Sequence, residues 1–181
     1  MNAARRVLVI GGARSGKSRY ALGLAETSGL ECLLVATAEP LDAEMRDRIA
    51  RHRAERSAAW RTIEAPLDLA DTIAAQARPG RVLLVDCLTV WLSNAMLAGR
   101  DADSAGETLT DAIARAAGPL VLVSNEVGGG IVPATPLGRA FRDAQGRLNQ
   151  GLAAVCDTVV LVTAGCPSLI KPAPPPAITL G

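Results

Sequence analysis

Short apolar runs separated by longer amphipathic segments are the main pattern of this chain. The runs predict buried strands of a parallel sheet, which are apolar on both faces, at residues 7–10, 32–37, 82–85, 120–123 and 158–162. A shorter strand is predicted at 60–63. Helical spacing and helix-ending residues between the runs predict helices at residues 17–28, 41–57, 66–77, 88–97, 107–117 and 137–155. This alternation indicates an α/β fold in which helices cover both faces of a mainly parallel sheet, in three α/β/α layers.

The stretch GGARSGKS follows the first apolar run directly and matches the pattern GxxxxGK[ST] in full. Its glycines let the main chain turn so that N–H groups converge on anionic oxygens. Lys17 is placed to reach the β- and γ-phosphates, and Ser18 to offer its hydroxyl to Mg²⁺. Strand, loop and helix occur in the order that this motif needs, so we predict a P-loop NTPase-like fold. The residues expected to bind nucleotide here are Gly11, Gly12, Ala13, Arg14, Ser15, Gly16, Lys17 and Ser18.

Polar residues that follow the predicted strands are the next candidates, because ligands of parallel α/β sheets bind at the carboxyl ends of the strands. Asp86 ends its apolar run and is a candidate for holding Mg²⁺ through water, together with Ser18. The alternative is that Asp86 caps the helix that follows. Thr37 and the run Ser124-Asn125-Glu126 reach the same edge, and the glycines at 128–130 form either a mobile lid or a turn.

The predicted helix at 41–57 carries the only histidine of the chain, His52. Arginines surround it, at positions 46, 48, 51, 53 and 56. A cationic setting suits polyphosphate and disfavours protonation of the imidazole, and a neutral imidazole is a nucleophile. From the residues alone, two interpretations stay open: a nucleophile or general base, or a solvated Arg/Glu helix with an incidental histidine.

Composition narrows the classes of function. The chain has 181 residues, 49% hydrophobic content and a net charge of +1, which fits one domain with a full core. We expect a catalytic domain at 1–171 and a proline-rich arm at 172–181, in which 177–180 would add an edge strand. The balanced charge and few aromatic residues argue against nucleic-acid binding. No apolar run approaches the roughly 20 residues of a membrane span, so we expect a cytoplasmic protein. The four cysteines lack CxxC spacing and are expected to be buried free thiols.

Six segments carry a more specific pattern, in order along residues 7–171: GGARSGKS, ATAEPLDAEMRDRIARHRAER, WRTIEAP, VLLVDCLTVWLSN, SNEVGGGIVP and PLGRAFRDAQGRLNQ. In these segments the chain resembles the bifunctional adenosylcobinamide kinase/adenosylcobinamide-phosphate guanylyltransferase family of cobalamin biosynthesis. The first segment is general to P-loop proteins, whereas RIARHRAER and SNEVGGGIVP are characteristic of this family.

The resemblance implies two reactions on one fold. The enzyme would phosphorylate the aminopropanol hydroxyl of adenosylcobinamide with ATP or GTP, and would then transfer GMP from GTP to that phosphate through a guanylylated histidine. It implies His52 as the nucleophile, and nucleotide contacts from Ala36, Thr37, Ala38, Arg53, Ala54, Glu55, Arg56, Glu64 and Asp86 in addition to the loop. Attack by imidazole on an α-phosphorus needs the phosphate charge to be offset, which the arginines, Lys17 and Mg²⁺ can supply. Taken without the resemblance, Glu64 is better explained as a surface acid. The resemblance also implies a propeller-like homotrimer, so we expect an oligomer.

Two other classes of function share the phosphate loop. A GTP-dependent switch protein would need a guanine-reading NKxD sequence, which the chain lacks. A small-metabolite P-loop kinase would transfer the γ-phosphoryl group directly and use the arginine-rich helix as a lid. Neither class requires a covalent intermediate on His52.

Overall fold

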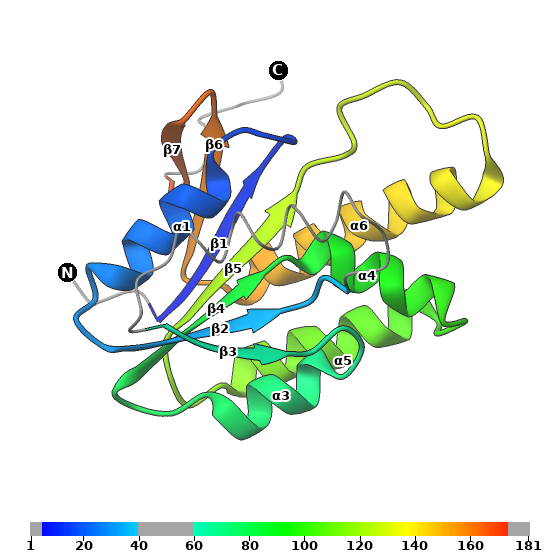
Figure 1. Ribbon diagram of the computed structural model, residues 1–181. Coiled ribbons are helices and arrows are strands. Elements are labelled where there is room, and N and C mark those ends of the chain that lie inside the picture. The colour runs from blue at the N-terminus through cyan, green and yellow to red at the C-terminus, as the bar shows by residue number, and fades with distance from the viewer. Residues whose placement is uncertain (1–4, 40–59, 174–181) are drawn as a thin grey trace, which may run out of the picture.

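Seven strands form one sheet in the order β3-β2-β4-β5-β1-β6-β7, in a computed structural model that describes residues 5–39 and 60–173 (Figure 1). The strands are β1 (Arg6–Gly11), β2 (Glu31–Ala36), β3 (Arg61–Glu64), β4 (Arg81–Asp86), β5 (Leu120–Asn125), β6 (Thr158–Thr163) and β7 (Cys166–Lys171). The helices are α1 (Lys17–Glu26), α3 (Leu69–Gln76), α4 (Leu88–Leu97), α5 (Ala102–Arg115) and α6 (Pro136–Val155). Neighbouring strands are parallel except for β6 and β7. The prediction of a mainly parallel α/β sheet is confirmed.

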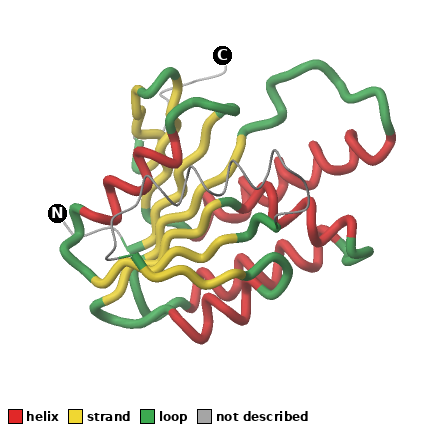
Figure 2. Tube along the Cα trace, in the orientation of Figure 1, coloured by secondary structure: helices red, strands yellow, loops and turns green. Residues whose placement is uncertain are grey.

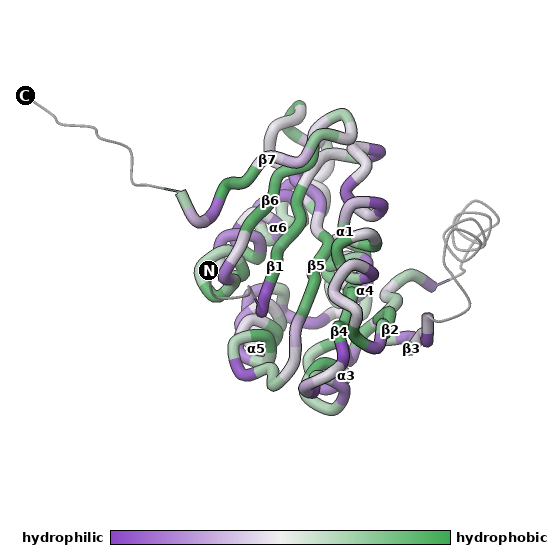
Figure 3. The backbone as a smooth tube through the Cα atoms, turned by 90° about the vertical axis from the view of Figure 1, so that its left-hand side faces the viewer, coloured by the Kyte–Doolittle hydropathy of each residue, from purple (hydrophilic) through white to green (hydrophobic). Residues whose placement is uncertain are grey.

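The sheet separates two hydrophobic cores, because successive side chains of a strand point to opposite faces. Leu8, Leu83 and Leu122 belong to the core under α3, α4, α5 and α6. Their neighbours Val9 and Leu84 belong to the core under α1. Figure 2 shows the strands between α1 on one side and α3, α4, α5 and α6 on the other, and in Figure 3 the tube along β1, β5 and β6 is mostly green, the hydrophobic end of the scale. Helices thus cover both faces, as predicted for three α/β/α layers.

Helix α5 begins earlier than the sequence pattern predicted. The pattern predicts a helix from Glu107, whereas α5 begins at Ala102. The carboxylate of Asp101 accepts a hydrogen bond of 2.8 Å from the main-chain N–H of Ser104, which is an N-cap contact. The capping residue therefore sets the start of the helix, although the first turn is polar.

Strand β7 was not predicted. It pairs with β6 through a two-residue turn in which Ala164 and Gly165 both have positive φ, 52° and 79°. Positive φ at both residues is the geometry of a type I′ hairpin turn, for which Asn-Gly or Gly-Gly is a clearer sequence signal than Ala-Gly. β7 pairs with β6 where the sheet ends. The edge strand that we predicted at 177–180 lies outside the described residues, as does the predicted helix at 41–57.

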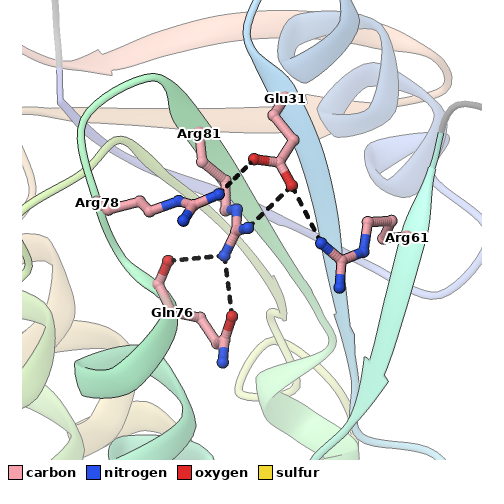
Figure 4. A network of polar contacts seen from close by, with 5 residues as sticks. All are labelled: Glu31, Arg61, Gln76, Arg78 and Arg81. Atoms are coloured by element: carbon pink, nitrogen blue, oxygen red, sulfur yellow. Dashed lines mark hydrogen bonds and ion pairs between the residues drawn. The ribbon is translucent and has the colours of Figure 1, made fainter.

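A cluster of ion pairs joins three strands at their amino ends, opposite the edge where the candidate site residues lie (Figure 4). Glu31 on β2 pairs with Arg81 and Arg78 at 2.9 Å each, and with Arg61 at 3.5 Å. Arg81 is 5% exposed and also donates to the side chain of Gln76 at 2.9 Å. Hydrogen bonds from Arg81 and then Arg78 lower the pKa of Glu31 from 4.5 to about 2. The carboxylate therefore stays ionised and ties β2, β3 and β4 together.

Candidate functional site

The phosphate loop lies between the end of β1 and the start of α1, as predicted. Gly16 occupies the N-cap position of α1 with φ of 94°, a conformation that glycine adopts without steric cost. A Cβ atom on Gly11 would lie 2.6 Å from Ser15 Oγ and would clash with the main-chain oxygen of Val162. Local geometry therefore requires glycine at both positions. The residues between them that project outward, and are exposed, are Gly12, Ala13 and Arg14.

Lys17 is folded back over this loop. The residue is 7% exposed, and its Nζ donates a hydrogen bond of 3.0 Å to the main-chain oxygen of Gly12. Ser18 follows in the first turn of α1 and is half-buried. The first turn of a helix leaves N–H groups without intrahelical partners, so this end of α1 is suited to an anion. Ammonium, hydroxyl and N–H groups thus meet at one place.

Two main-chain hydrogen bonds hold the loop against neighbouring strand ends. The N–H of Glu126, just after β5, donates to the oxygen of Gly11 at 3.0 Å. The N–H of Gly165, in the β6–β7 turn, donates to the oxygen of Ser15 at 2.8 Å. The loop is therefore braced on both sides of β1.

Three of the predicted site residues lie side by side at the carboxyl edge of β3, β2 and β4. Ala36 is the register partner of both Glu64 and Asp86. Asp86 stands on the face that α1 covers, because Leu84, two residues earlier on β4, belongs to the α1 core. The N-cap of α4 is Cys87, with no side-chain cap. The alternative role of Asp86 as a helix cap is therefore wrong, and Asp86 faces the side of the sheet that carries Lys17.

Thr37 holds the ends of β2 and β4 together. Its hydroxyl donates to the main-chain oxygen of Cys87 at 2.7 Å and accepts from the Cys87 N–H at 2.9 Å. Thr37 is fully buried, and Nδ2 of Asn94 donates to its main-chain oxygen at 2.9 Å. Ala38 follows at the same edge and is half-buried. The Thr37 hydroxyl is thus occupied by Cys87, so its side chain positions the strand end that carries Asp86.

Cys87 lies within electrostatic reach of the site. Burial raises the pKa of its thiol, the charge of Asp86 raises it further, and that of Lys17 opposes the shift. All four cysteines are free thiols, as predicted, but only Cys156 is fully buried: Cys32 and Cys87 are half-buried, and Cys166, at the start of the unpredicted strand β7, is exposed.

Several predicted site residues lie outside the described part of the chain: His52, Arg53, Ala54, Glu55 and Arg56. The glycines at 128–130 lie in a turn, where the N–H of Gly128 donates to the carboxylate of Glu126 at 2.8 Å. Within residues 5–39 and 60–173, no helix is long and apolar enough to cross a membrane.

The comparisons with known proteins decide the family. A sequence model described as "Cobinamide kinase / cobinamide phosphate guanyltransferase" matches residues 7–170. This chain belongs to the cobinamide kinase/cobinamide phosphate guanyltransferase family. The resemblance noted in the six sequence segments is therefore confirmed.

Curated members of the cobinamide kinase/guanyltransferase family are similar over nearly their whole length. The bifunctional adenosylcobalamin biosynthesis protein CobP of Pseudomonas aeruginosa is 47% identical over 171 residues, which are 93% of this chain and 99% of that protein. The proteins named CobU of Escherichia coli and Salmonella typhimurium are each 41% identical over 180 residues, covering 91% of this chain and 99% of theirs.

One solved structure, of a protein from Pyrococcus horikoshii OT3, has the same fold as this member of the family. The TM-score is 0.51 at 11% identity, over 93% of this chain and 88% of that one. An identity this low supports the α/β fold only.

The residues present fit a hydrated Mg²⁺ that arrives with a nucleotide. In the part of the chain that the structure describes, no group of three or more His, Cys, Asp or Glu could hold a metal by itself. Mg²⁺ in phosphate-transfer sites is held by one or two protein oxygens together with phosphates and water. Ser18 at the start of α1 and Asp86 on the same face of the sheet are the oxygens that this family member would use.

Three polar residues that support this edge of the sheet from α4 and α6 have no signal in the sequence that marks them. Thr89 and Asn94 on α4, and Asn149 on α6, hydrogen-bond to the ends of β5 and β2. They were included in predicted helices, and nothing in a single sequence shows which polar side chains of a helix turn toward a strand end. A buried polar residue on an otherwise apolar helix face is the pattern that would have revealed them.

Proposed function

We propose that this protein catalyses both reactions described by the name of its family. It phosphorylates adenosylcobinamide with ATP or GTP, and it then transfers GMP from GTP to adenosylcobinamide phosphate, giving adenosylcobinamide-GDP and pyrophosphate. The observation that carries the proposal is the phosphate loop with Lys17 and Asp86 on one face of the sheet, in a chain that matches the family over residues 7–170. We further propose that it works in the cytoplasm as a homotrimer, with Mg²⁺.

The phosphorylation step needs little beyond placement and charge. The loop N–H groups and the N-terminus of α1 bind the β- and γ-phosphates. The ammonium group of Lys17, which hydrogen-bonds to the main-chain oxygen of Gly12 in this structure, offsets the negative charge of these phosphates. Mg²⁺ held by Ser18 and Asp86 would offset the remaining charge when it is bound. The hydroxyl oxygen of adenosylcobinamide forms a bond to the γ-phosphorus, the bond to the β-γ bridging oxygen breaks, and the hydroxyl proton is released.

The guanylyl transfer proceeds in two displacements at the α-phosphorus of GTP. A neutral imidazole nitrogen of His52 forms a bond to that phosphorus, and pyrophosphate leaves. A phosphate oxygen of adenosylcobinamide phosphate then attacks the same phosphorus, and His52 leaves. Arg53 and Arg56, near His52 in sequence, would offset negative charge on the phosphates together with Lys17.

Labelling with GTP tests the covalent step. The purified protein is incubated with Mg²⁺ and GTP carrying radioactive α-phosphorus, then denatured, and the retained label is counted. We expect acid-labile, alkali-stable label in the wild type, none in His52→Ala, and none when the label is at the γ-position. Absence of α-label in wild-type protein that binds GTP would remove the histidine intermediate and favour a direct P-loop kinase.

A further inference from the structure

Asn125 occupies the position between the phosphate loop and Asp86. It ends β5, the strand that separates β1 from β4 in the sheet (Figure 1). Asn125 is the register partner of Gly11 on β1, and Val123 on the same strand is the register partner of Asp86 on β4. Neighbouring strands lie about 4.8 Å apart, so Asn125 is one strand spacing from Gly11 of the loop, and it lies two residues beyond the level of Asp86 on the neighbouring strand β4.

The side chain of Asn125 stands on the same face as Lys17 and Asp86. Val121 and Val123 belong to the core under α1, and Asn125 is the next residue of that alternating set. Ser124 points to the opposite face, where its hydroxyl donates to Oδ1 of Asn149 on α6 at 2.7 Å. The alternation along β5 thus directs the Asn125 amide toward the nucleotide side.

The backbone of Asn125 is fixed from behind. Its N–H donates to Oγ1 of Thr89 at 2.8 Å, and its main-chain oxygen accepts from Nδ2 of Asn149 at 3.1 Å. Asn149 is itself held by Ser124 and Gln145, both fully buried. Side chains from α4 and α6 therefore hold Asn125 in one orientation.

The side-chain oxygen of Asn125 is buried, and no described residue donates a hydrogen bond to it. A buried acceptor without a donor is costly, so such an atom in a prepared position is suited to a donor that arrives with a ligand. Ionised phosphate oxygens only accept hydrogen bonds, so they cannot donate one to Oδ1 of Asn125. A hydrated Mg²⁺ can supply the donor, because it keeps several waters whose hydrogens point away from the metal.

We infer that Oδ1 of Asn125 accepts a hydrogen bond from a water of the Mg²⁺ that accompanies the bound nucleotide. Asn125 is then a positioning residue for the metal–nucleotide complex, between the water held by Asp86 and the loop. The inference rests on the proposed nucleotide site, and it does not depend on the His52 intermediate.

Metal affinity, measured separately from catalysis, tests this role. A non-hydrolysable fluorescent GTP analogue is bound first in EDTA, and Mg²⁺ is then titrated into the complex. Asn125→Leu keeps the approximate shape and removes the acceptor, so it should weaken Mg²⁺ binding roughly tenfold or more while leaving metal-free binding of the analogue near that of the wild type. Asn125→Asp keeps the acceptor oxygens and should bind Mg²⁺ at least as tightly as the wild type.

Gln150→Leu is the matched control, because it removes a side-chain amide at an exposed position of α6, outside the network that holds Asn125, and should leave Mg²⁺ affinity unchanged. Should Asn125→Leu fail to fold, Asn125→Ala replaces it. Equal Mg²⁺ affinity in wild type and in the variant without the acceptor would overturn the inference, as would equal loss in Asn125→Asp. If the wild type itself shows no Mg²⁺-dependent binding of the analogue, the proposed function fails together with the inference. If the wild type binds Mg²⁺ and the analogue but Asn125→Leu binds them equally well, only the inference fails.

Discussion

The main-chain N–H of Gly165 donates a hydrogen bond of 2.8 Å to the main-chain oxygen of Ser15. The first residue belongs to the turn between β6 and β7, and the second to the phosphate loop at the other end of the chain. A Cβ atom on Gly16 would lie 3.2 Å from the Cα of Gly165, so the turn and the loop are also in close contact. The C-terminal hairpin is therefore part of the support of the nucleotide site.

Gly165→Val should weaken nucleotide binding from outside the loop. Gly165 has φ of 79°, where a β-branched residue costs about 1–3 kcal/mol, so the turn would shift and its contact with Ser15 would loosen. We expect a several-fold lower affinity for GTP by isothermal titration and a lower melting temperature. Gly129→Val is the control, since a Cβ there meets nothing within 4 Å. Equal effects of the two substitutions would contradict the bracing role.

The two adjacent glycines at the start of the loop should respond differently to alanine. Gly11→Ala places a Cβ against the oxygen of Val162 and Ser15 Oγ, and overpacking of this kind typically costs about 1–3 kcal/mol. Gly12→Ala meets nothing within 4 Å. Thermal unfolding without nucleotide should therefore show a clear loss of stability only for Gly11→Ala. A similar loss for both variants would show that the steric argument is wrong.

Thr37→Val should destabilise the edge that carries Asp86. It removes the hydroxyl that both donates to and accepts from the main chain of Cys87, and an unpaired buried group costs about 1–3 kcal/mol. Chemical denaturation should show this loss, and kinase activity should fall because Asp86 is no longer held in place. Thr37→Ser keeps the hydroxyl and should stay close to the wild type in both assays. Wild-type stability of Thr37→Val would rule out the positioning role.

Lys17→Ala and His52→Ala should separate the two reactions. Lys17 serves the phosphates in both steps, so its loss should lower the rates of both by about 10²-fold or more. His52→Ala should abolish guanylyl transfer and retain at least part of the phosphorylation of adenosylcobinamide. Product formation from each step can be followed by chromatography. If folded His52→Ala protein lost both activities equally, the proposed division of roles would be wrong.

Acid should remove the contribution of Glu31 to stability. A carboxylate whose folded-state pKa is about 2, against 4.5 ordinarily, stabilises the fold above pH 4.5 and loses this effect as the pH falls toward 2. Glu31→Gln should therefore be less stable than the wild type at pH 7, and the difference should narrow between pH 4.5 and 2. Urea unfolding of both proteins at several pH values measures this difference in the free energy of unfolding. Glu107→Gln, at an exposed glutamate on α5, is the control, and a difference from the wild type that stays constant with pH would contradict the assignment.

The sequence by itself determined the local features of this protein. Apolar runs specified β1, β2, β4, β5 and β6, because strands buried on both faces must be apolar throughout. The order strand, GGARSGKS, helix specified the loop, because the glycines and Lys17 act through conformations within eight residues of one another. The same segments also identified the family.

The tertiary structure decided which distant residues meet. Strand order placed Asn125 between Gly11 and Asp86, and no pattern within one segment encodes the order of strands in a sheet. The tertiary structure also shows that the Thr37 hydroxyl hydrogen-bonds to the main chain of Cys87. The β6–β7 hairpin, whose turn sequence is a weak signal, hydrogen-bonds to the phosphate loop. Side-chain alternation and hydrogen bonds between residues close in sequence are determined locally. Which strands become neighbours in a sheet depends on the packing of the whole chain, and that packing forms the edge of the sheet where the site lies.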